Sequence, residues 1–458
     1  MEREHLKSRL GFILLSAGCA IGIGNIWRFP YVVGENGGGI FLLFYLIFLV
    51  MMGVPLLSME YAIGRASGMS IMNAYSVLKP EDKKWSAHGK IALAGNYLLM
   101  MFYSTVSGWM AYYFSSFTRG ELMGMEPSAV AEYFSELLGS PAKLLIWMLI
   151  MVVLGFSICS MGLQKGVEKI TKVMMSALLV LIIMLAVHSL TLPGAKEGLS
   201  FYLYPNIEAV SSRGFLNVIA AAMNQAFFTL SIGIGSMMIF GSYMDKGRRL
   251  MSESLTVAVL DTFVAITAGL IIFPACFAYG VEPDSGPSLV FITLPNVFGS
   301  MAGGRIWGSL FFLFMTFASL STLIAVFENI MACCMDGFGW SRKKAALINF
   351  IIVAAGSVPC VLGFNLWSGF MPLGEGTNVL DLEDFIVSNL LLPIGSIIIL
   401  LFCTRKKGWG FDSFLKEANE GKGMKLSDNK AMRFYLSYIV PVLIAFLVIY
   451  GIINVFVK

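Results

Sequence analysis

Several side chains with neutral oxygen atoms lie inside long apolar segments of this chain, together with one carboxylate. The carboxylate is Asp261, and the neutral groups are Asn25, Thr229, Ser231, Ser321 and Thr322. Such oxygens are the ligands that a hard cation such as sodium prefers. A membrane serine or threonine can also simply bond the carbonyl one turn back. An ionisable residue in a membrane segment is costly, however, and indicates function.

Two of the apolar segments contain glycine pairs that can interrupt a helix. Gly22 and Gly24 lie in the first segment, and Gly233 and Gly235 lie in the sixth. Free backbone groups are tolerated in lipid only where they face protein, water or a ligand. A half-helix N-terminus suits a carboxylate, whereas loop carbonyls suit a cation. The alternative reading of the first pair is a packing face against a neighbouring helix.

The composition is that of a polytopic membrane protein. Of the 458 residues, 57% are hydrophobic and only 13% are charged, whereas a soluble domain carries about 25% charged residues. The mean hydropathy is +0.78. The first apolar run lacks a small-residue cleavage site, so no cleavable signal peptide is expected. The seven cysteines show no metal-binding spacing and are expected to be core residues.

Eleven apolar spans are expected to cross the cell membrane. Most of the 32 basic residues fall in the loops of one side, which the positive-inside rule assigns to the cytoplasm together with the N-terminus. The odd number of spans places the C-terminus outside. The expected spans are residues 11–35, 40–64, 91–117, 142–162, 171–192, 215–243, 254–279, 305–335, 345–363, 384–403 and 434–456.

The interrupted segments are the first and the sixth, which indicates an internal repeat. Because they are five spans apart, a second five-helix unit enters the membrane from the opposite side, as in many secondary transporters. We therefore expect an all-α polytopic protein with one transmembrane domain, 1–458. Its parts are a first repeat (1–192), a second inverted repeat (213–406) and a cytoplasmic segment with the eleventh span (407–458).

Two further carboxylates lie nearer the ends of spans. Glu60 and Glu328 are expected to be structural rather than ion-binding. Glu60 is expected to accept hydrogen bonds from an unwound stretch of backbone.

Motifs of enzymes and nucleotide-driven pumps are absent from the sequence. The chain has three histidines, no HExxH and no Gly-x4-Gly-Lys-Ser/Thr. The two Gly-x-Gly pairs have Trp27 and Met238 where a dinucleotide-binding turn needs a third small residue. We therefore expect neither an ATP-driven pump nor a hydride-transfer enzyme, and no nucleic-acid partner.

Four stretches together resemble the neurotransmitter:sodium symporter family over almost the whole chain. They are Gly24-Asn25-Ile26-Trp27-Arg28-Phe29-Pro30-Tyr31, Glu35-Asn36-Gly37-Gly38-Gly39, Gln225-Ala226-Phe227-Phe228-Thr229-Leu230-Ser231 and Ser341-Arg342-Lys343-Lys344. The resemblance implies the LeuT fold, with two inverted five-helix repeats and spans 1 and 6 unwound at mid-membrane. The lack of a twelfth span is similar to a bacterial subgroup of amino-acid transporters in the family.

The resemblance also implies two sodium sites. The first site consists of the Ala20 carbonyl and the side chains of Asn25, Thr229 and Asp261, with the substrate carboxylate as a further ligand. The second site consists of the carbonyls of Gly18, Ile21 and Ala318 and the hydroxyls of Ser321 and Thr322.

A substrate site beside the sodium ions is implied in the same way. The substrate carboxylate is expected to meet backbone N–H groups around Ile21, Gly22 and Gly24 and the hydroxyl of Tyr103. The substrate amine is expected to meet carbonyls near Phe228, Thr229 and Ser231, with Phe228 as a lid. The expected apolar walls are Leu99, Phe228, Ile234, Ser319 and Val326.

Two gates complete the implied pattern. Arg28 and Asp384 are expected to form the outer gate, and Arg3 and Asp336, with Tyr243 nearby, the inner gate. Two positions depart from the family. Leu6 stands where a tryptophan is common, and Ser176 replaces the proline that often follows a glycine such as Gly166 by ten positions. The second departure speaks against an unwinding of span 5.

These features predict a sodium-coupled symporter that imports hydrophobic (aliphatic or aromatic) L-amino acids by alternating access, with a monomer sufficient for transport. Gly22 stands where carriers of monoamines have an aspartate, which leaves room for a substrate carboxylate. One alternative is a sodium-dependent channel or sensor of the same fold, which favours a continuous polar pore. The other is a membrane enzyme such as an acyltransferase, which needs a nucleophile–base pair that the sequence does not show.

Chloride is not expected to be required. Tyr45, Gln225 and Ser231 match a chloride site of relatives, but Ala265 stands where chloride-dependent members have a serine. Asp261 supplies the negative charge that chloride otherwise gives, and a unit charge at a few ångströms matters by several kcal/mol. When the sodium ions leave, this carboxylate is expected to take up a proton, so proton antiport accompanies the return step.

Overall fold

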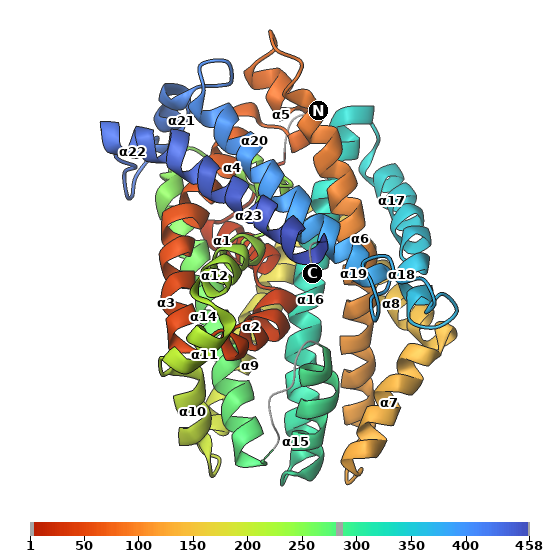
Figure 1. The fold of residues 1–458 in the computed structure, drawn as a ribbon. Coiled ribbons are helices and arrows are strands. Elements are labelled where there is room, and N and C mark those ends of the chain that lie inside the picture. The colour runs from red at the N-terminus through yellow and green to blue at the C-terminus, as the bar shows by residue number, and fades with distance from the viewer. Residues whose placement is uncertain (1–3, 281–286, 457–458) are drawn as a thin grey trace.

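The chain folds into a bundle of helices, shown in Figure 1. The structure is a computed structural model that describes residues 4–280 and 287–456. Within these ranges it contains helices, turns and two isolated β-bridges but no strand. The all-α prediction is therefore confirmed for the described part of the chain.

The first half supplies five spans and two connecting helices. Span 1 is α1 (Arg9–Ala20), a π-helical turn (Gly24–Arg28) and α2 (Phe29–Glu35), and span 2 is α3 (Gly39–Phe48), a π-helical turn (Leu49–Gly53) and α4 (Val54–Ser67). Spans 3 and 4 are α6 (Ser86–Arg119) and α8 (Pro141–Ser160). Span 5 is a π-helical turn (Leu163–Glu168) and α9 (Lys169–Leu190), and α5 (Ile71–Leu78) and α7 (Pro127–Gly139) lie between spans.

The second half begins after α10 (Ala195–Leu203) and α11 (Ile207–Arg213). Span 6 consists of α12 (Phe215–Thr229) and α13 (Ser236–Ser242). Span 7 is α14 (Leu250–Ala278), and span 8 is α16 (Gly304–Phe338). A π-helical turn (Leu289–Thr293) and α15 (Leu294–Ser300) lie between spans 7 and 8. Span 9 is α17 (Arg342–Gly356) and α18 (Val358–Gly363), and span 10 is α19 (Val379–Phe385), a π-helical turn (Ile386–Leu391) and α20 (Leu392–Thr404). The remainder is α21 (Phe411–Ala418) and span 11, which is α22 (Lys430–Phe434), a π-helical turn (Tyr435–Ile439) and α23 (Val440–Phe456).

The structure supports most, but not all, of the eleven expected membrane crossings. Eight helices of the described chain are long and apolar enough to cross a membrane, and nine if the bent pair of span 1 is one crossing. The two other expected crossings are α6 and the divided span 6. Span 6 falls short because its longer piece, α12, is only 15 residues. The number eleven therefore stays a prediction.

The helices form an enclosed centre and an apolar outer surface. The most apolar stretch of α16 is 78% buried, whereas that of span 11 is only 22% buried. Figure 1 shows α16 in the middle of the bundle, with α6 and α8 on one side and α1, α12 and α14 on the other. The two interrupted spans therefore lie next to the most enclosed helix of the protein.

Both interrupted spans break where the sequence has glycine. Span 1 bends by 58° between Ala20 and Gly24. In span 6, the backbone leaves the helix after Thr229 and adopts positive φ at Ser231, Gly233 and Gly235. Glycine adopts such angles readily, whereas Ser231 is the only other described residue with a positive φ. The predicted unwinding of spans 1 and 6 is confirmed.

The segment after span 10 is fastened to one end of the bundle. Arg65 Nε of α4 lies 2.5 Å from Glu417 Oε1 of α21, and both side chains are buried. Arg65 Nη1 also donates to the carbonyl of Arg248 (2.7 Å). The exposed Lys246 meets Glu420, and this hydrogen bond raises the pKa of Lys246. These contacts join α21 to the loop between spans 6 and 7.

Candidate functional site

The break in span 1 lies against hydroxyl groups of α16. Ser321 Oγ donates to the carbonyls of Gly18 (3.1 Å) and Ala318 (2.8 Å). Thr322 Oγ1 lies 3.1 Å from the Gly18 carbonyl, 3.3 Å from that of Ile21 and 3.4 Å from that of Ala318. All five oxygen-bearing groups that the resemblance assigns to one sodium site therefore meet in one place. The bonds to Ala318 also show the back-bonding that membrane hydroxyls commonly make.

A second cluster joins the two breaks through Asp261 of α14. Asn25 Nδ2 donates to Asp261 Oδ1 (2.7 Å) and to Thr229 Oγ1 (3.2 Å), and Thr229 Oγ1 donates to Asp261 Oδ2 (2.8 Å). All three side chains are buried. The carboxylate is thus satisfied by one amide and one hydroxyl, without a basic partner among these bonds.

The donor set of this cluster fits sodium with one adjustment. The amide oxygen of Asn25 accepts from the N–H of Gly22 (3.1 Å) while its nitrogen faces Asp261. For the oxygen to be an ion ligand beside Asp261, the Asn25 side-chain amide must rotate so that its oxygen and nitrogen exchange places. Ala20 lines the cavity next to the cluster.

A small cavity lies between the breaks. It has a volume of about 30 Å³ and is lined by residues from spans 1, 3, 6, 8 and 10. Tyr103 of α6 accepts a hydrogen bond from the N–H of Ile23 (3.0 Å) at its wall. The predicted residues in the wall are Ala20, Gly22, Gly24, Asn25, Leu99, Tyr103, Phe228, Thr229, Ser231 and Thr322. A space near the volume of one water molecule is too small for an amino acid, so the walls must move to admit one.

Three predicted wall residues do not line this cavity. Ile234 packs toward Gly95 of α6, Ser319 bonds back to the carbonyl of Thr316 (3.1 Å), and Val326 is fully buried one turn beyond Thr322. These three residues do not line the closed cavity, and their contact with a bound substrate stays a prediction. The walls instead include Cys19 and Leu392. No sequence signal marked Leu392, because span 10 reaches the cavity only through tertiary packing.

The expected outer gate is not formed as an ion pair. The guanidinium of Arg28 lies over the Phe228 ring, 4.4 Å from its centroid. Asp384 instead accepts a hydrogen bond from Ser388 (2.6 Å). No ion pair joins Arg28 to Asp384 in the described chain. Phe228 lines the cavity, as expected of a lid, and the guanidinium of Arg28 covers its ring.

At the other end of the site, Tyr243 belongs to a network that the sequence reasoning missed. Its hydroxyl donates to Glu328 Oε1 (2.8 Å). Arg342 holds both oxygens of the same buried carboxylate, at 2.7 and 2.9 Å. Asp336 accepts from the N–H of Ser70 (2.7 Å), whereas Arg3 lies outside the described residues. A basic residue at the first position of span 9 was the available signal for Arg342.

The break in span 6 is held by side chains of spans 2 and 3. Glu60 Oε1 accepts from the N–H of Gly233 (2.6 Å), which confirms that Glu60 serves an unwound backbone. His88 Nε2 lies 3.2 Å from the carbonyl of the same Gly233, and its Nδ1 pairs with the hydroxyl of Tyr75 (2.7 Å). Asn96 donates to the carbonyl of Ile234 (2.8 Å). The N–H of Gly233 and the carbonyls of Gly233 and Ile234 are therefore all held by side chains.

We expect Glu60→Ala to lower the apparent melting temperature of the purified protein by several degrees. Loss of the acceptor leaves the buried N–H of Gly233 unpaired, which costs about 1–3 kcal/mol. Glu60→Gln keeps an acceptor oxygen and is the matched control, with a much smaller loss. Equal melting temperatures for the wild type and the alanine variant would contradict this role.

Comparisons with known proteins agree with this geometry. A family model described as the sodium:neurotransmitter symporter family matches residues 3–126 and 128–457. YhdH, an uncharacterized sodium-dependent transporter of Bacillus subtilis (strain 168), is 33% identical over 449 residues, 98% of each chain. An uncharacterized sodium-dependent transporter of Haemophilus influenzae is 32% identical over 459 residues, 97% of each chain.

A solved structure gives the same result for the fold. The crystal structure of MhsT in complex with L-phenylalanine matches with a TM-score of 0.88 and 38% sequence identity, and covers 98% of this chain and 100% of that chain. The LeuT fold and sodium-coupled transport across a membrane by a multi-pass protein, rather than enzymatic catalysis, follow from these matches. The chain belongs to the sodium:neurotransmitter symporter family.

Proposed function

We propose that this protein imports hydrophobic L-amino acids together with sodium by alternating access. The observation that carries the proposal is the convergence of both helix breaks on one cavity flanked by two oxygen clusters. One cluster contains Ser321 and Thr322 and the other contains Asp261. Secondary transporters place substrate and coupling ions at such breaks near mid-membrane.

Sodium is held in this proposal by the two clusters described above. Ser321, Thr322 and the carbonyls of Gly18, Ile21 and Ala318 form one site, and Asp261, Thr229, Asn25 and the Ala20 carbonyl form the other. A bound cation supplies positive charge beside the cavity, which favours a substrate carboxylate. The protein contributes a buried arrangement in which ion and substrate stabilise each other.

The recognition of an amino acid rests on the backbone near Gly22. The hydroxyl of Tyr103 and the N–H of Ile23 already form a hydrogen bond at the cavity wall, and both suit a carboxylate. Carbonyls at the end of α12 suit an ammonium group. Leu99, Phe228 and Leu392 give the cavity apolar walls, and the MhsT structure has L-phenylalanine bound. These facts support a hydrophobic side chain, leucine-like or aromatic.

Chloride independence and proton antiport are part of the proposal. Asp261 brings a fixed negative charge to the cluster between the breaks, so an anion beside it is repelled. Without sodium, the same carboxylate is an uncompensated buried charge, which is costly, and a proton is the simplest substitute. Import runs toward the side that holds the N-terminus, which the positive-inside rule assigns to the cytoplasm.

The test of the proposed function is uptake into liposomes. We expect sodium-driven uptake of leucine, methionine or an aromatic amino acid at least tenfold above glutamate or lysine, because burying a leucine-sized group contributes up to about 3 kcal/mol. The decarboxylated amines tyramine and isoamylamine should not compete, because they lack the carboxylate. Equal competition by tyramine and tyrosine, or preferred uptake of a charged amino acid, would sink the proposal.

Two further outcomes distinguish the alternatives. A channel of the same fold gives a sodium current that does not saturate with substrate. A sensor binds an amino acid with sodium but accumulates none inside the liposomes.

A further inference from the structure

Seven carboxyl groups are buried within the described residues, and six of them have strong hydrogen-bond donors. The seventh is Glu383 of α19, which is only 6% exposed. Its oxygen Oε2 has no hydrogen-bond partner among the described residues. A buried charge without partners is costly, so the state of this group needs its own explanation. The six others, which meet backbone N–H groups, hydroxyls, an amide or an arginine, are Glu60, Glu168, Glu253, Asp261, Glu328 and Glu417.

The carboxyl group of Glu383 meets a thiol instead of a strong donor. The thiol belongs to Cys360 of α18, which in turn meets the hydroxyl of Thr105 on α6. A thiol is only a weak donor and a weak acceptor, so it does little to stabilise an ionised carboxylate. The Thr105 hydroxyl already donates to the carbonyl of Met101 (3.3 Å). The group is therefore enclosed between spans 3, 9 and 10, whose helices α6, α18 and α19 lie together in Figure 1.

The charges on its own helix do not compensate Glu383 either. The titratable neighbours are Asp381 and Asp384, and both are acidic. Asp381 accepts from the N–H of Asn378 (2.8 Å), and Asp384 accepts from Ser388 (2.6 Å). Like charges nearby disfavour an ionised carboxylate. The surroundings on α19 therefore favour the neutral form of Glu383.

The elements packed against α19 bring no positive charge to this carboxyl group. Neither α18 nor the π-helical turn Ile386–Leu391 has a charged residue. The basic residues of α6 lie near its two ends, and Arg119 pairs with Glu121 (3.0 Å). Glu383 forms no ion pair within the described part of the chain.

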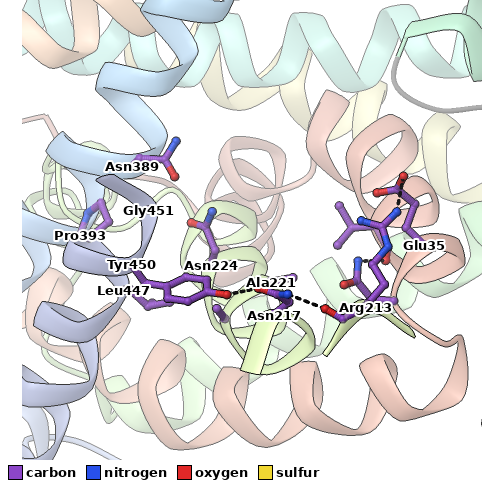
Figure 2. A pocket seen from close by; sticks show the side chains of 13 residues that line it. Glu35, Arg213, Asn217, Ala221, Asn224, Asn389, Pro393, Leu447, Tyr450 and Gly451 are labelled. Carbon is purple, nitrogen blue, oxygen red and sulfur yellow. Dashed lines mark hydrogen bonds and ion pairs between the residues drawn. The ribbon is translucent and has the colours of Figure 1, made fainter. Parts of the chain in front are cut away.

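The cavity that borders span 10 does not reach Glu383. Figure 2 shows this cavity, which has a volume of about 380 Å³ and has Asn389 and Pro393 of span 10 in its wall. Glu383 does not line it. Burial therefore separates the carboxyl group from this space as well as from positive charge. A proton is the partner that removes the cost of the buried charge without needing further room.

We propose that Glu383 is a proton-binding site in span 10, separate from Asp261. In the closed arrangement of this structure the carboxyl group is neutral and holds a proton. When α19 separates from α6 and α18, the proton leaves to water, and the carboxylate takes hydrogen bonds from water in its place. The positive-inside rule assigns this end of span 10 to the outside, so the proton is exchanged with the external solution.

This site links external pH to the closing of the outer side. The closed arrangement binds the proton more tightly than the open one, because only the open one hydrates the carboxylate. By linkage, a rise in external pH then favours the open arrangement. Only this consequence rests on the proposed alternating access. The proton site itself rests on the burial and contacts of Glu383.

Infrared spectroscopy of the full-length protein tests whether Glu383 holds the proton. A neutral carboxylic acid has a carbonyl stretching band that an ionised carboxylate lacks. At neutral pH in saturating sodium, which keeps Asp261 ionised, we expect such a band in the wild type and its loss in Glu383→Gln. Cys360→Ala should keep the band at a shifted frequency, because the thiol contact is gone. Glu375→Gln, an exposed carboxyl group on the loop before α19, is the matched control.

Uptake into liposomes at constant internal pH tests the link to transport. We expect sodium-driven uptake by the wild type to fall at alkaline external pH, by up to about tenfold for each pH unit, since one proton is released per opening. Glu383→Gln resembles the neutral acid at every pH and should lose this dependence. Glu375→Gln should behave as the wild type.

Two results overturn the proposal. One is a spectrum in which Glu383→Gln removes no carbonyl band and Cys360→Ala shifts none. The other is the same dependence of uptake on external pH in the wild type and in Glu383→Gln. The infrared result needs no transport, so a protein that shows the band but accumulates no amino acid contradicts the proposed function alone.

Discussion

Alanine at position 22 is expected to abolish measurable substrate binding. A Cβ atom on Gly22 would lie 2.4 Å from the Tyr103 hydroxyl and 2.8 Å from Thr322 Oγ1. Both oxygens must then move, which breaks the bond from Ile23 to Tyr103 and displaces a proposed sodium ligand. Overpacking costs typically 1–3 kcal/mol and each lost bond adds about 1 kcal/mol, so affinity should fall by roughly a hundredfold or more.

Equilibrium binding of a radiolabelled amino acid in saturating sodium measures this effect. Gly139→Ala is the control, because a Cβ there meets no atom within 4 Å. The Gly22 variant should still elute as a monodisperse protein, since the disturbed atoms line a cavity. Binding within threefold of the wild type would show that the backbone at Gly22 is not where the substrate lies.

Asparagine at position 261 is expected to weaken sodium binding by about thirtyfold. The carboxylate is buried and accepts from Asn25 and Thr229, and the proposal makes it the charged ligand of one sodium ion. Loss of one member of a buried charge pair costs about 2 kcal/mol or more, which is ~30-fold in affinity. The variant should also lose the dependence of uptake on internal pH, because its side chain cannot take up a proton.

Sodium titrations of uptake into liposomes, at several internal pH values and with gluconate in place of chloride, measure all three properties. Wild-type uptake should survive without chloride, whereas the variant, which lacks the fixed charge, should gain from it. Thr262→Val, next to Asp261 on α14, is a nearby control that keeps the carboxylate. Wild-type transport that collapses without chloride would falsify the charge argument, and so would a variant with unchanged sodium affinity and pH dependence.

The positions of the breaks could be predicted because they depend on local chemistry. Glycine lowers the stability of a helix, so a glycine pair in an otherwise apolar segment predicts a break. The structure interrupts both spans at these pairs. The role of Glu60 followed similarly, since a buried carboxylate near an unwound segment needs donors. The grouping of Ser321 and Thr322 with Gly18 joins residues about 300 positions apart, and only the family resemblance indicated it.

Other features depend on packing that no local pattern encodes. Leu392 reaches the central cavity because span 10 lies against the breaks, and Arg342 reaches Glu328 across the start of span 9. Whether Arg28 pairs with Asp384 depends on the conformation of the whole protein. Because one sequence adopts all of these conformations, the sequence does not say which of them contains the pair. Two expected crossings do not stand out by length and apolar composition, because α6 carries many polar residues and α12, the longer helix of span 6, has only 15 residues.

The helix breaks in spans 1 and 6 differ in the contacts that hold them. Glu60, His88 and Asn96 hold the span 6 break through side chains of the protein alone. The span 1 break is held by Ser321 and Thr322 through the same carbonyls that sodium is proposed to occupy. The span 6 break is therefore held whether or not an ion is bound, whereas the rigidity of the span 1 break changes when an ion binds or leaves. Binding or release of sodium can therefore change the position of α1, while the contacts that hold α13 stay the same.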